Sequence, residues 1–376
     1  MTFLKSNHVL WVLLVSLLIG VVGGSFYLIS QNDSNYLYAS PDYTLQFPKD
    51  HASHPKYQNE WWYYTGHLTA ENGNKYGFQI TFFRVGLTPE QQHESKWRSN
   101  TFYFGHLALT DKGGKKFYYT EKVSRGGEFD DTEAREDIYK VRLNDWRGEL
   151  LGKFHHFEAS GDSISLNLIA TPLKSPVLQG KNGYSQKGAN PKNASMYYSL
   201  TRNSVQGVLL LNGQPMIVTG ECWMDHEFGT SQLTADQIGW DWFSLQMSDT
   251  TELMLFKIRK NDGATEEKSH GSFVAVNGSK QELLLKDYSI QVLKTWKSPL
   301  SNAEYPIQWK IRVPSQQIDY TVTAVIENQE LKTENSARIV YWEGATSVEG
   351  MRAGQRVSGQ GYVEMTGYAG AITVLQ

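Results

Sequence analysis

An all-β fold is the class that this sequence predicts: two tandem antiparallel β-barrels or sandwiches, preceded by one N-terminal transmembrane helix. Aromatic residues make up 13% of the 376 residues, and aromatic side chains are enriched in strands. Hairpin-type turn pairs, such as Asn212-Gly213 and Asn277-Gly278, separate segments with strand-like alternation. The first ~40 residues carry instead one long uncharged apolar run.

The uncharged run covers residues 9–29, which are 21 positions. As a helix it would reach across a bilayer core of ~30 Å, and Lys5 before it and Asp33 after it place the N-terminus in the cytoplasm. We therefore expect a cytoplasmic tail (1–8), a single-pass inner-membrane anchor (9–29), a linker (30–42) and a periplasmic bulk of the chain. The alternative is a signal peptide that is cleaved to release a secreted protein.

The remaining chain is long enough for two domains, each with its own core, and we place them at residues 43–232 and 233–376. The second contains about eight strand-like segments, and eight strands close a small barrel that can hold one ligand. Helical pattern is limited to residues 88–96 and 230–238. The Gly- and Asn-rich segment 174–195 has neither pattern, and we expect a mobile flap over the ligand mouth.

Composition excludes several classes of function. The formal net charge is -3 without a long basic run, so nucleic acid is not an expected partner. The single cysteine, Cys222, rules out an internal disulfide and a cysteine-cluster metal site. His226 with Glu60, His67 or His106 could supply metal ligands, but no metal-binding spacing occurs, and neither a phosphate loop nor a G-x-S-x-G elbow is present. We therefore expect no metal ion and no organic cofactor.

The first motif is the aromatic run NEWWYYTGHL. In a strand, Glu60, Trp62 and Tyr64 share one face, while Trp61 and Tyr63 point to the other. Because both faces are aromatic, we expect one to meet the core and the other a cavity or the partner domain. A partly desolvated Glu60 is a candidate proton donor. The alternative is a structural glutamate that hydrogen-bonds a neighbouring arginine or loop amide.

The second motif is the stretch 220–247, which combines acids, a histidine and three tryptophans. We expect it to be an irregular seam between the two halves. In a regular strand Asp225 and His226 would point to opposite faces, but from an irregular seam both can enter one cavity. A histidine held by a carboxylate transfers protons near neutral pH, so both residues are candidates for acid–base catalysis. The alternative is that Asp225 caps the loop and His226 is a satisfied interdomain histidine.

Two C-terminal segments, YWEGATSVEG and GQGYVEMTGY, form the third motif. Tyr341 and Glu343 share one face of the first segment, and Tyr362 and Glu364 share one face of the second. Inward-facing glutamates would place polar groups in an apolar lumen, so we favour solvent-facing edge positions for both.

Taken together, the three motifs resemble the lipocalin-like family of the AttH proteins and the carotenoid 1,2-hydratases (hydroxyneurosporene synthases), from about Tyr43 onward. The resemblance implies two lipocalin-like β-barrels or sandwiches in tandem, and fungal pericyclases of similar architecture bind polyenes between the two. The hydratases add water to a terminal alkene without an organic cofactor, and their Asp-His element matches Asp225 and His226. This chain departs from them at Phe228, where they carry Trp, and in residues 252–259, which lack their Tyr-x-Asp.

Three functions follow as expectations. The leading one is a membrane-anchored, extracytoplasmic protein that binds an apolar lipid- or terpenoid-like molecule. The second is a cofactor-independent hydratase or isomerase with Glu60 and Asp225/His226 as acid and base. The third is an accessory or scaffold protein of an envelope transport system such as an ABC-type transporter. The side chains expected to line the ligand site are Trp62, Tyr64, His106, Trp223, Trp240, Trp242, Tyr341 and Tyr362.

Overall fold

A computed structural model describes residues 36–87, 100–126, 130–231 and 233–370. The expected anchor at 9–29 and the helical candidate at 88–96 lie outside the described residues. None of the helices in the described part of the chain is both long enough and apolar enough to cross a membrane.

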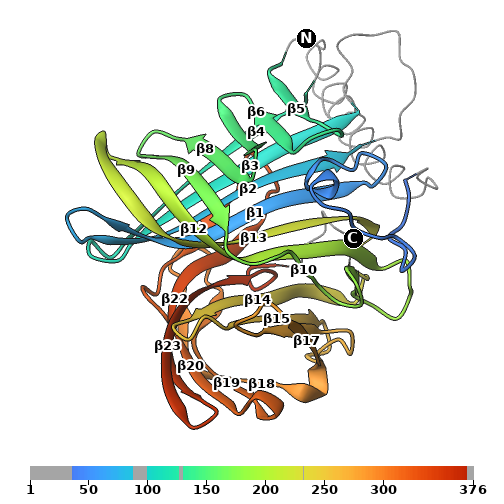
Figure 1. Ribbon diagram of the computed structural model, residues 1–376, viewed down its shortest axis with the longest axis vertical. Helices are drawn as coiled ribbons and strands as arrows, with labels where there is room; N and C mark the ends of the chain where they lie inside the picture. Colours follow the sequence, from blue (N-terminus) through green and yellow to red (C-terminus); the bar gives the residue numbers. More distant parts are fainter. Residues whose placement is uncertain (1–35, 88–99, 127–129, 232, 371–376) are drawn as a thin grey trace, which may run out of the picture. The chain divides into compact units, whose positions relative to one another are not determined.

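The described chain is all-β, as predicted, and forms two curled antiparallel sheets (Figure 1). In the first sheet, of 13 strands, the order is β4-β3-β2-β1-β13-β12-β9-β8-β7-β6-β5, with β10 and β11 paired to β12. Its strands are β1 (Asn59–Ala70), β2 (Lys75–Gly86), β3 (Thr101–Asp111), β4 (Lys116–Ser124), β5 (Thr132–Ala134), β6 (Lys140–Leu143), β7 (Trp146–Leu151), β8 (Phe154–Ser160), β9 (Ile164–Pro172), β10 (Val177–Leu178), β11 (Tyr184–Gln186), β12 (Ala194–Leu211) and β13 (Gln214–Ser231).

The second sheet has 10 strands in the order β17-β16-β15-β14-β23-β22-β20-β19-β18, with β21 paired to β22. The expected count of eight was therefore too low. Its strands are β14 (Gln237–Met247), β15 (Glu252–Lys260), β16 (His270–Val274), β17 (Lys280–Leu284), β18 (Ser289–Lys297), β19 (Glu304–Val313), β20 (Ile318–Ala324), β21 (Glu330–Lys332), β22 (Val340–Arg352) and β23 (Gln355–Met365). Three 3-10 turns, η1 (Lys49–His51), η2 (Leu285–Asp287) and η3 (Pro314–Gln316), complete the described elements.

The expected irregular seam is wrong, because its first part belongs to one long strand. β13 pairs with β1 without a break, from Asn59 opposite Gly229 to Ala70 opposite Val218. This ladder keeps the chain extended up to Ser231, and β14 starts at Gln237. The helix expected at 230–238 is therefore wrong for the described residues of that segment. Strand alternation therefore holds along the whole motif and sends neighbouring side chains to opposite faces.

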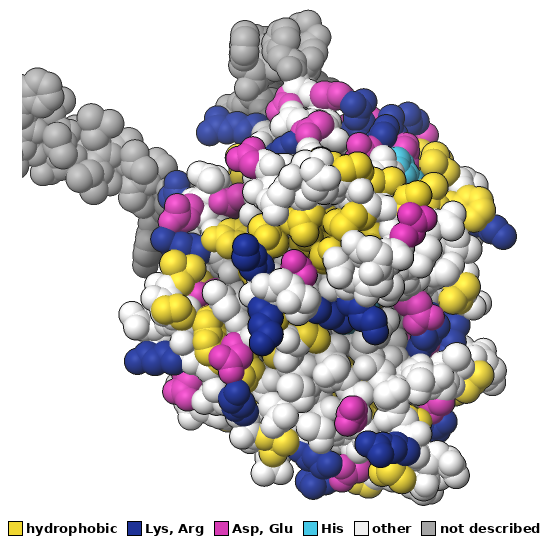
Figure 2. Space-filling view, turned by 90° about the vertical axis from the view of Figure 1, so that its left-hand side faces the viewer, with side chains coloured by type: hydrophobic (Ala, Val, Ile, Leu, Met, Phe, Trp, Pro, Cys, Tyr) yellow, Lys and Arg dark blue, Asp and Glu magenta, His cyan; other side chains and the backbone are white. Residues whose placement is uncertain are grey.

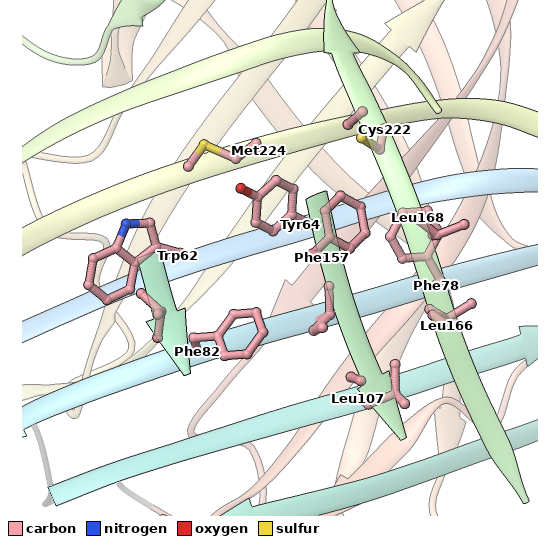
Figure 3. Close-up of a cluster of buried hydrophobic side chains, with 14 of the residues drawn as sticks. Trp62, Tyr64, Phe78, Phe82, Leu107, Phe157, Leu166, Leu168, Cys222 and Met224 are labelled. Carbon is pink, nitrogen blue, oxygen red and sulfur yellow. The ribbon is translucent and has the colours of Figure 1, made fainter. Parts of the chain in front are cut away.

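β1 and β13 consequently have two buried faces, as predicted for β1. Trp62 and Tyr64 face the interior of the first sheet, where Figure 3 shows them beside Met224 and Cys222 of β13. Tyr63 points the other way, into an apolar cluster between the two sheets. That cluster is completed by Tyr197, Trp223, Leu233, Trp242, Met254, Phe256, Ile258, Ala345 and Tyr362.

A small apolar patch lies on the surface of the first sheet. The tryptophans of the second motif do not belong to it. Val208 of β12 lies opposite Ile217 of β13, and Ile169 lies on the adjacent β9. The three side chains are 37–56% exposed. On the face that Figure 2 shows, hydrophobic side chains gather mainly in a band across its upper half, among polar and charged side chains.

Glycine at position 220 permits the close approach of β1 and β13. A Cβ atom on Gly220 would fall well inside van der Waals contact with the backbone oxygen of His67. We predict that Gly220→Ala lowers the free energy of unfolding by about 2–3 kcal/mol, as other overpacked interiors do. Gly113, whose Cβ would meet nothing closer than 3.7 Å, is the matched control, and equal denaturation midpoints for the two variants would contradict the prediction.

Candidate functional site

The interior of the first sheet holds a fully buried carboxylate at Glu60. His226 lies with its Nε2 3.0 Å from Glu60 Oε1, and Arg84 donates from Nε to Glu60 Oε2 at 2.9 Å. The backbone and ring of His54 and the hydroxyl of Ser53 also donate to this carboxylate. Two of the three predicted catalytic residues, Glu60 and His226, are thus brought together. They lie inside a saturated network, in which both oxygens of Glu60 already accept hydrogen bonds.

The electrostatics of this network favour a structural role. Burial raises the pKa of Glu60, but the hydrogen bonds from His226 and His54 and the charge of Arg84 outweigh it, so the pKa lies well below its usual value. Burial lowers the pKa of His226, so the ring is neutral at neutral pH. Trp62 stacks on that ring at 4.8 Å between centroids. Glu60 is thus bound to a neighbouring arginine, which is the contact that the structural alternative describes.

Ligand atoms of His54, Glu60 and His226 lie within 4.8 Å of one another and are of the types that hold transition metals. Each of these atoms already takes part in a hydrogen bond, and Glu60 is paired with the Arg84 guanidinium. A cation would have to break these bonds and lie beside a positive charge. The donor set therefore fits an ion-pair network better than a metal centre.

A separate cavity lies between the two sheets. The first sheet, with the segment that precedes β12, contributes Trp61, Tyr63, Thr81, Phe83, Lys187, Tyr197, Asp225 and Glu227; Leu233 and the second sheet contribute Trp240, Trp242, Phe256 and Glu364. Its free space is about 60 Å³, small beside the roughly 300–1,000 Å³ of typical ligand pockets. Trp240 is only partly buried, so we expect its ring to move when a larger ligand enters.

Asp225 is one of two acids on the first-sheet side of this cavity, and it is 4% exposed. Its carboxylate accepts hydrogen bonds from Tyr197 OH at 2.8 Å, Ser199 Oγ at 2.5 Å and Trp223 Nε1 at 2.6 Å. Burial raises its pKa to about 7, although these three donors act in the opposite direction. Alternation in β13 thus separates Asp225 from His226, and the expectation that both enter one cavity is wrong.

Glu364 is the acid on the second-sheet side. One of its oxygens accepts a hydrogen bond from Trp240 Nε1 at 2.9 Å, and burial raises its pKa to about 7. Its cross-strand partner, Glu343, is fully buried and accepts from Tyr63 OH at 2.7 Å. The solvent-facing edge positions expected for Glu343 and Glu364 are therefore wrong, because β22 and β23 lie against the first sheet rather than at a free edge.

The segment expected as a flap, 174–195, contains the short strands β10 and β11 and delivers a lysine to the cavity wall. Lys187 Nζ lies 2.6 Å from Glu227 Oε1 and 4.4 Å from the ring centroid of Phe256. Ser195 also donates to Glu227. The third acid of the cavity is therefore paired with a cation, unlike Asp225 and Glu364.

The predicted ligand-lining residues divide among five places. Trp240 and Trp242 line the cavity between the sheets. Trp223 supports Asp225 from behind the wall, and Trp62 and Tyr64 belong to the interior of the first sheet. His106 and Tyr341 are hydrogen-bonded at 2.8 Å and line another apolar cavity, also of about 60 Å³, which Glu60 and Arg84 line as well. This cavity shares Trp61, Phe83, Trp240 and Glu364 with the first, while Tyr362 is buried between the sheets.

Four important residues were absent from the prediction: Tyr63, Lys187, Tyr197 and Glu364 as a site residue. Alternation along the first motif could have found Tyr63, since it places that side chain on the face opposite Trp62. Tyr197 follows the same rule in β12, where it lies opposite Glu227. Nothing in the local sequence of the segment around Lys187 points to a cavity.

Fold and cavity together define the class of protein: two curled antiparallel sheets in tandem with an acidic, aromatic-walled cavity between them. The family model described as AttH-like matches residues 38–368, and the chain belongs to that family. The resemblance drawn from the three motifs is confirmed at this level.

Relatives of known structure share the fold. The crystal structure of a protein assigned to AttH from Nitrosomonas europaea is 31% identical, with a TM-score of 0.80, and the match covers 88% of this chain and 99% of that one. Kievitone hydratase from Nectria haematococca has a TM-score of 0.68 at 14% identity over 90% of this chain and 97% of its own, which shows the fold alone. The dehydratase asqC of Emericella nidulans is 21% identical over 222 residues, 55% of this chain and only 60% of that protein.

We predict that Glu60→Gln lowers the free energy of unfolding at neutral pH by about 3–5 kcal/mol, because it leaves Arg84 buried without its counter-charge. The pKa of Glu60 is depressed in the folded state, so its contribution is present above the unfolded value near 4.5 and is lost as pH falls through the folded value. Urea denaturation at several pH values measures this. The exposed Glu71→Gln is the control, and a similarly small loss for both would contradict the prediction.

We predict that Glu364→Gln raises the free energy of unfolding, whereas Glu60→Gln lowers it. The pKa of Glu364 rises from 4.5 to about 7 on folding, so ionisation destabilises the folded state increasingly as pH rises between those values. Glutamine can still accept from Trp240 and carries no charge. We expect little change in the free energy of unfolding at pH 4.5 and an increase of roughly 2 kcal/mol at pH 8, after allowance for solvent screening. Urea denaturation at the two pH values measures both. The exposed Glu349→Gln serves as control, and a pH-independent effect of Glu364→Gln would refute this.

Proposed function

We propose that this protein is a cofactor-independent acid–base lyase that adds water to, or removes it from, an apolar unsaturated substrate in the cavity between the sheets. The observation that carries the proposal is the presence of two carboxyl groups with pKa values of about 7 in the wall of one aromatic cavity. Groups with such pKa values can both donate and accept protons near neutral pH.

In the hydration direction, protonated Glu364 donates its proton to one alkene carbon, and the other carbon becomes cationic. Glu364 suits this role because only one hydrogen bond, from Trp240, is directed at its carboxyl among the described residues. The rings of Trp240, Trp242 and Phe256 line the same cavity and would stabilise the cation through their π faces. The oxygen of a water molecule then bonds to the cationic carbon.

Asp225 completes the reaction as the base. As its carboxylate it takes the proton that the attacking water loses, so that alkene and water yield one alcohol. Tyr197, Ser199 and Trp223 hold the carboxylate in place through the three hydrogen bonds described above. Dehydration is the same sequence reversed, with Asp225 as acid and Glu364 as base. This assignment replaces Glu60 and His226 with Glu364, and keeps Asp225.

The named relatives are compatible with this chemistry. One structure with the same fold is a hydratase, and one sequence relative is a dehydratase, although the chain spans only about 60% of the latter. An apolar substrate also agrees with the proposed anchor at 9–29, since such molecules partition into membranes. Both points support the proposal without carrying it.

We expect turnover to be detectable in water enriched in oxygen-18. A panel of prenylated phenols and terpenoid alkenes or tertiary alcohols is incubated with the protein, and mass spectrometry detects oxygen-18 incorporation or loss of water. Glu364→Gln and Asp225→Asn should each lower the rate about 10²–10⁴-fold, because each removes a proton-transfer group. Glu60→Gln should retain activity in the fraction that folds. Full activity in Glu364→Gln would overturn the proposal, and binding of panel compounds without turnover would instead indicate a carrier.

A further inference from the structure

Four side-chain atoms between the two sheets are buried and have no hydrogen-bond partner among the described residues. They are Thr65 Oγ1, Gln79 Oε1, Glu343 Oε2 and Tyr362 OH. A buried polar atom left without a partner costs about 1–3 kcal/mol, so such atoms in folded proteins usually bind water. Because all four atoms lie between the sheets, they mark candidate water sites in one part of the molecule.

Along β1, the residues that face the second sheet alternate with a period of two. Tyr63 lines the aromatic cavity, Thr65 follows on the same face, and His67 comes next. His67 lines a different cavity, of about 560 Å³, at the far side of the interface. Thr65 and its unpartnered hydroxyl therefore lie between the two cavities.

β23, the facing strand, repeats this order. Glu364 lines the aromatic cavity, Tyr362 follows on the same face, and Gln360 lines the second cavity. The Tyr362 hydroxyl lies over Gly77 of β2, the cross-strand partner of His67, and is thus one step nearer to the second cavity than the hydroxyl of Thr65. Together, β1 and β23 place a row of polar side chains across an interface that is otherwise apolar.

Contacts between the strands show that the two series face each other. Tyr63 OH donates to Glu343, the cross-strand partner of Glu364. At the other end, His67 Nε2 donates to the backbone oxygen of Gly361 at 2.9 Å, and its ring centroid lies 5.8 Å from that of Tyr362. Gln79 pairs with Thr65 across β1 and β2 and so belongs to the same layer.

The second cavity is suited to hold water. Its lining is mostly polar, with hydroxyl groups of Thr69, Thr171, Ser204 and Thr219. Lys112, which also lines this cavity, donates from Nζ to Nδ1 of His67 at 2.9 Å. A polar cavity of this volume holds many water molecules.

We propose that a file of bound water crosses the interface along Thr65, Gln79, Tyr362 and Glu343 and connects this polar cavity to the aromatic cavity. The four residue steps of strand from Tyr63 to His67 span about 13 Å, which a few hydrogen-bonded water molecules bridge. The inference rests on the proposed function for its purpose: water, the second substrate of a hydratase, would reach Glu343 and Glu364 from one side. The apolar substrate would enter past Trp240 from the other.

The direction in which Tm changes when these hydroxyl groups are removed tests the file of water. If the hydroxyls bind water, Thr65→Val and Tyr362→Phe break that network, and Tm falls by about 2 °C. If the hydroxyls are dry, their removal relieves an unsatisfied buried group, and Tm rises. The matched control is Thr346→Val, whose unpartnered hydroxyl lies on the other face of β22, inside the second sheet. An equal rise in all three variants would overturn the proposal.

A high-resolution crystal structure of the full chain gives the second test. We expect solvent density within hydrogen-bond distance of Thr65 Oγ1, Tyr362 OH and Glu343 Oε2, and its loss at the first two sites in the respective variants. Direct protein–protein hydrogen bonds at these atoms, without solvent density, would rule the file out. Neither readout depends on turnover, so failure of the proposed lyase activity and failure of the water file are distinguishable.

Discussion

The pairing of β1 with β13 is the constraint on which the rest of the structure depends. Both strands lie in the middle of the first sheet, and both faces are buried along most of β1 and along residues 222–230 of β13. Because a strand sends successive side chains to opposite sides, Asp225 and His226 enter different environments although they are neighbours in sequence. One face builds the saturated Glu60 network, and the other builds the wall of the aromatic cavity.

These two environments treat buried acids in opposite ways. Inside the first sheet, a guanidinium and several donors surround Glu60 and keep it ionised, which stabilises the fold. Between the sheets, Glu343 and Glu364 lie opposite each other without any cation bonded to them among the described residues, and burial favours their protonated forms. Such uncompensated acids lower stability, and proteins keep groups of this kind mainly at functional sites.

Sequence reasoning predicted the fold class and the two-faced nature of β1, because alternation and turn pairs are local signals. It failed for the stretch 220–247, where glycines and mixed polarity suggested irregular structure, although cross-strand pairing with β1 overrides such local preferences. It also failed for Glu343 and Glu364. Their burial depends on how β22 and β23 lie against β1 and β2, which no local pattern encodes. Asp225 does line the aromatic cavity, but the partnership with His226 expected for it is one that alternation forbids.

The lone cysteine has a practical consequence. Cys222 is fully buried on β13, and burial raises the pKa of its thiol, so the reactive thiolate form is scarce at neutral pH. A thiol introduced on the surface would therefore be the one group that maleimide dyes or spin labels modify in the native state. Pairs of such labels, one on each sheet, would report by fluorescence transfer or electron resonance whether the two sheets separate when a ligand enters.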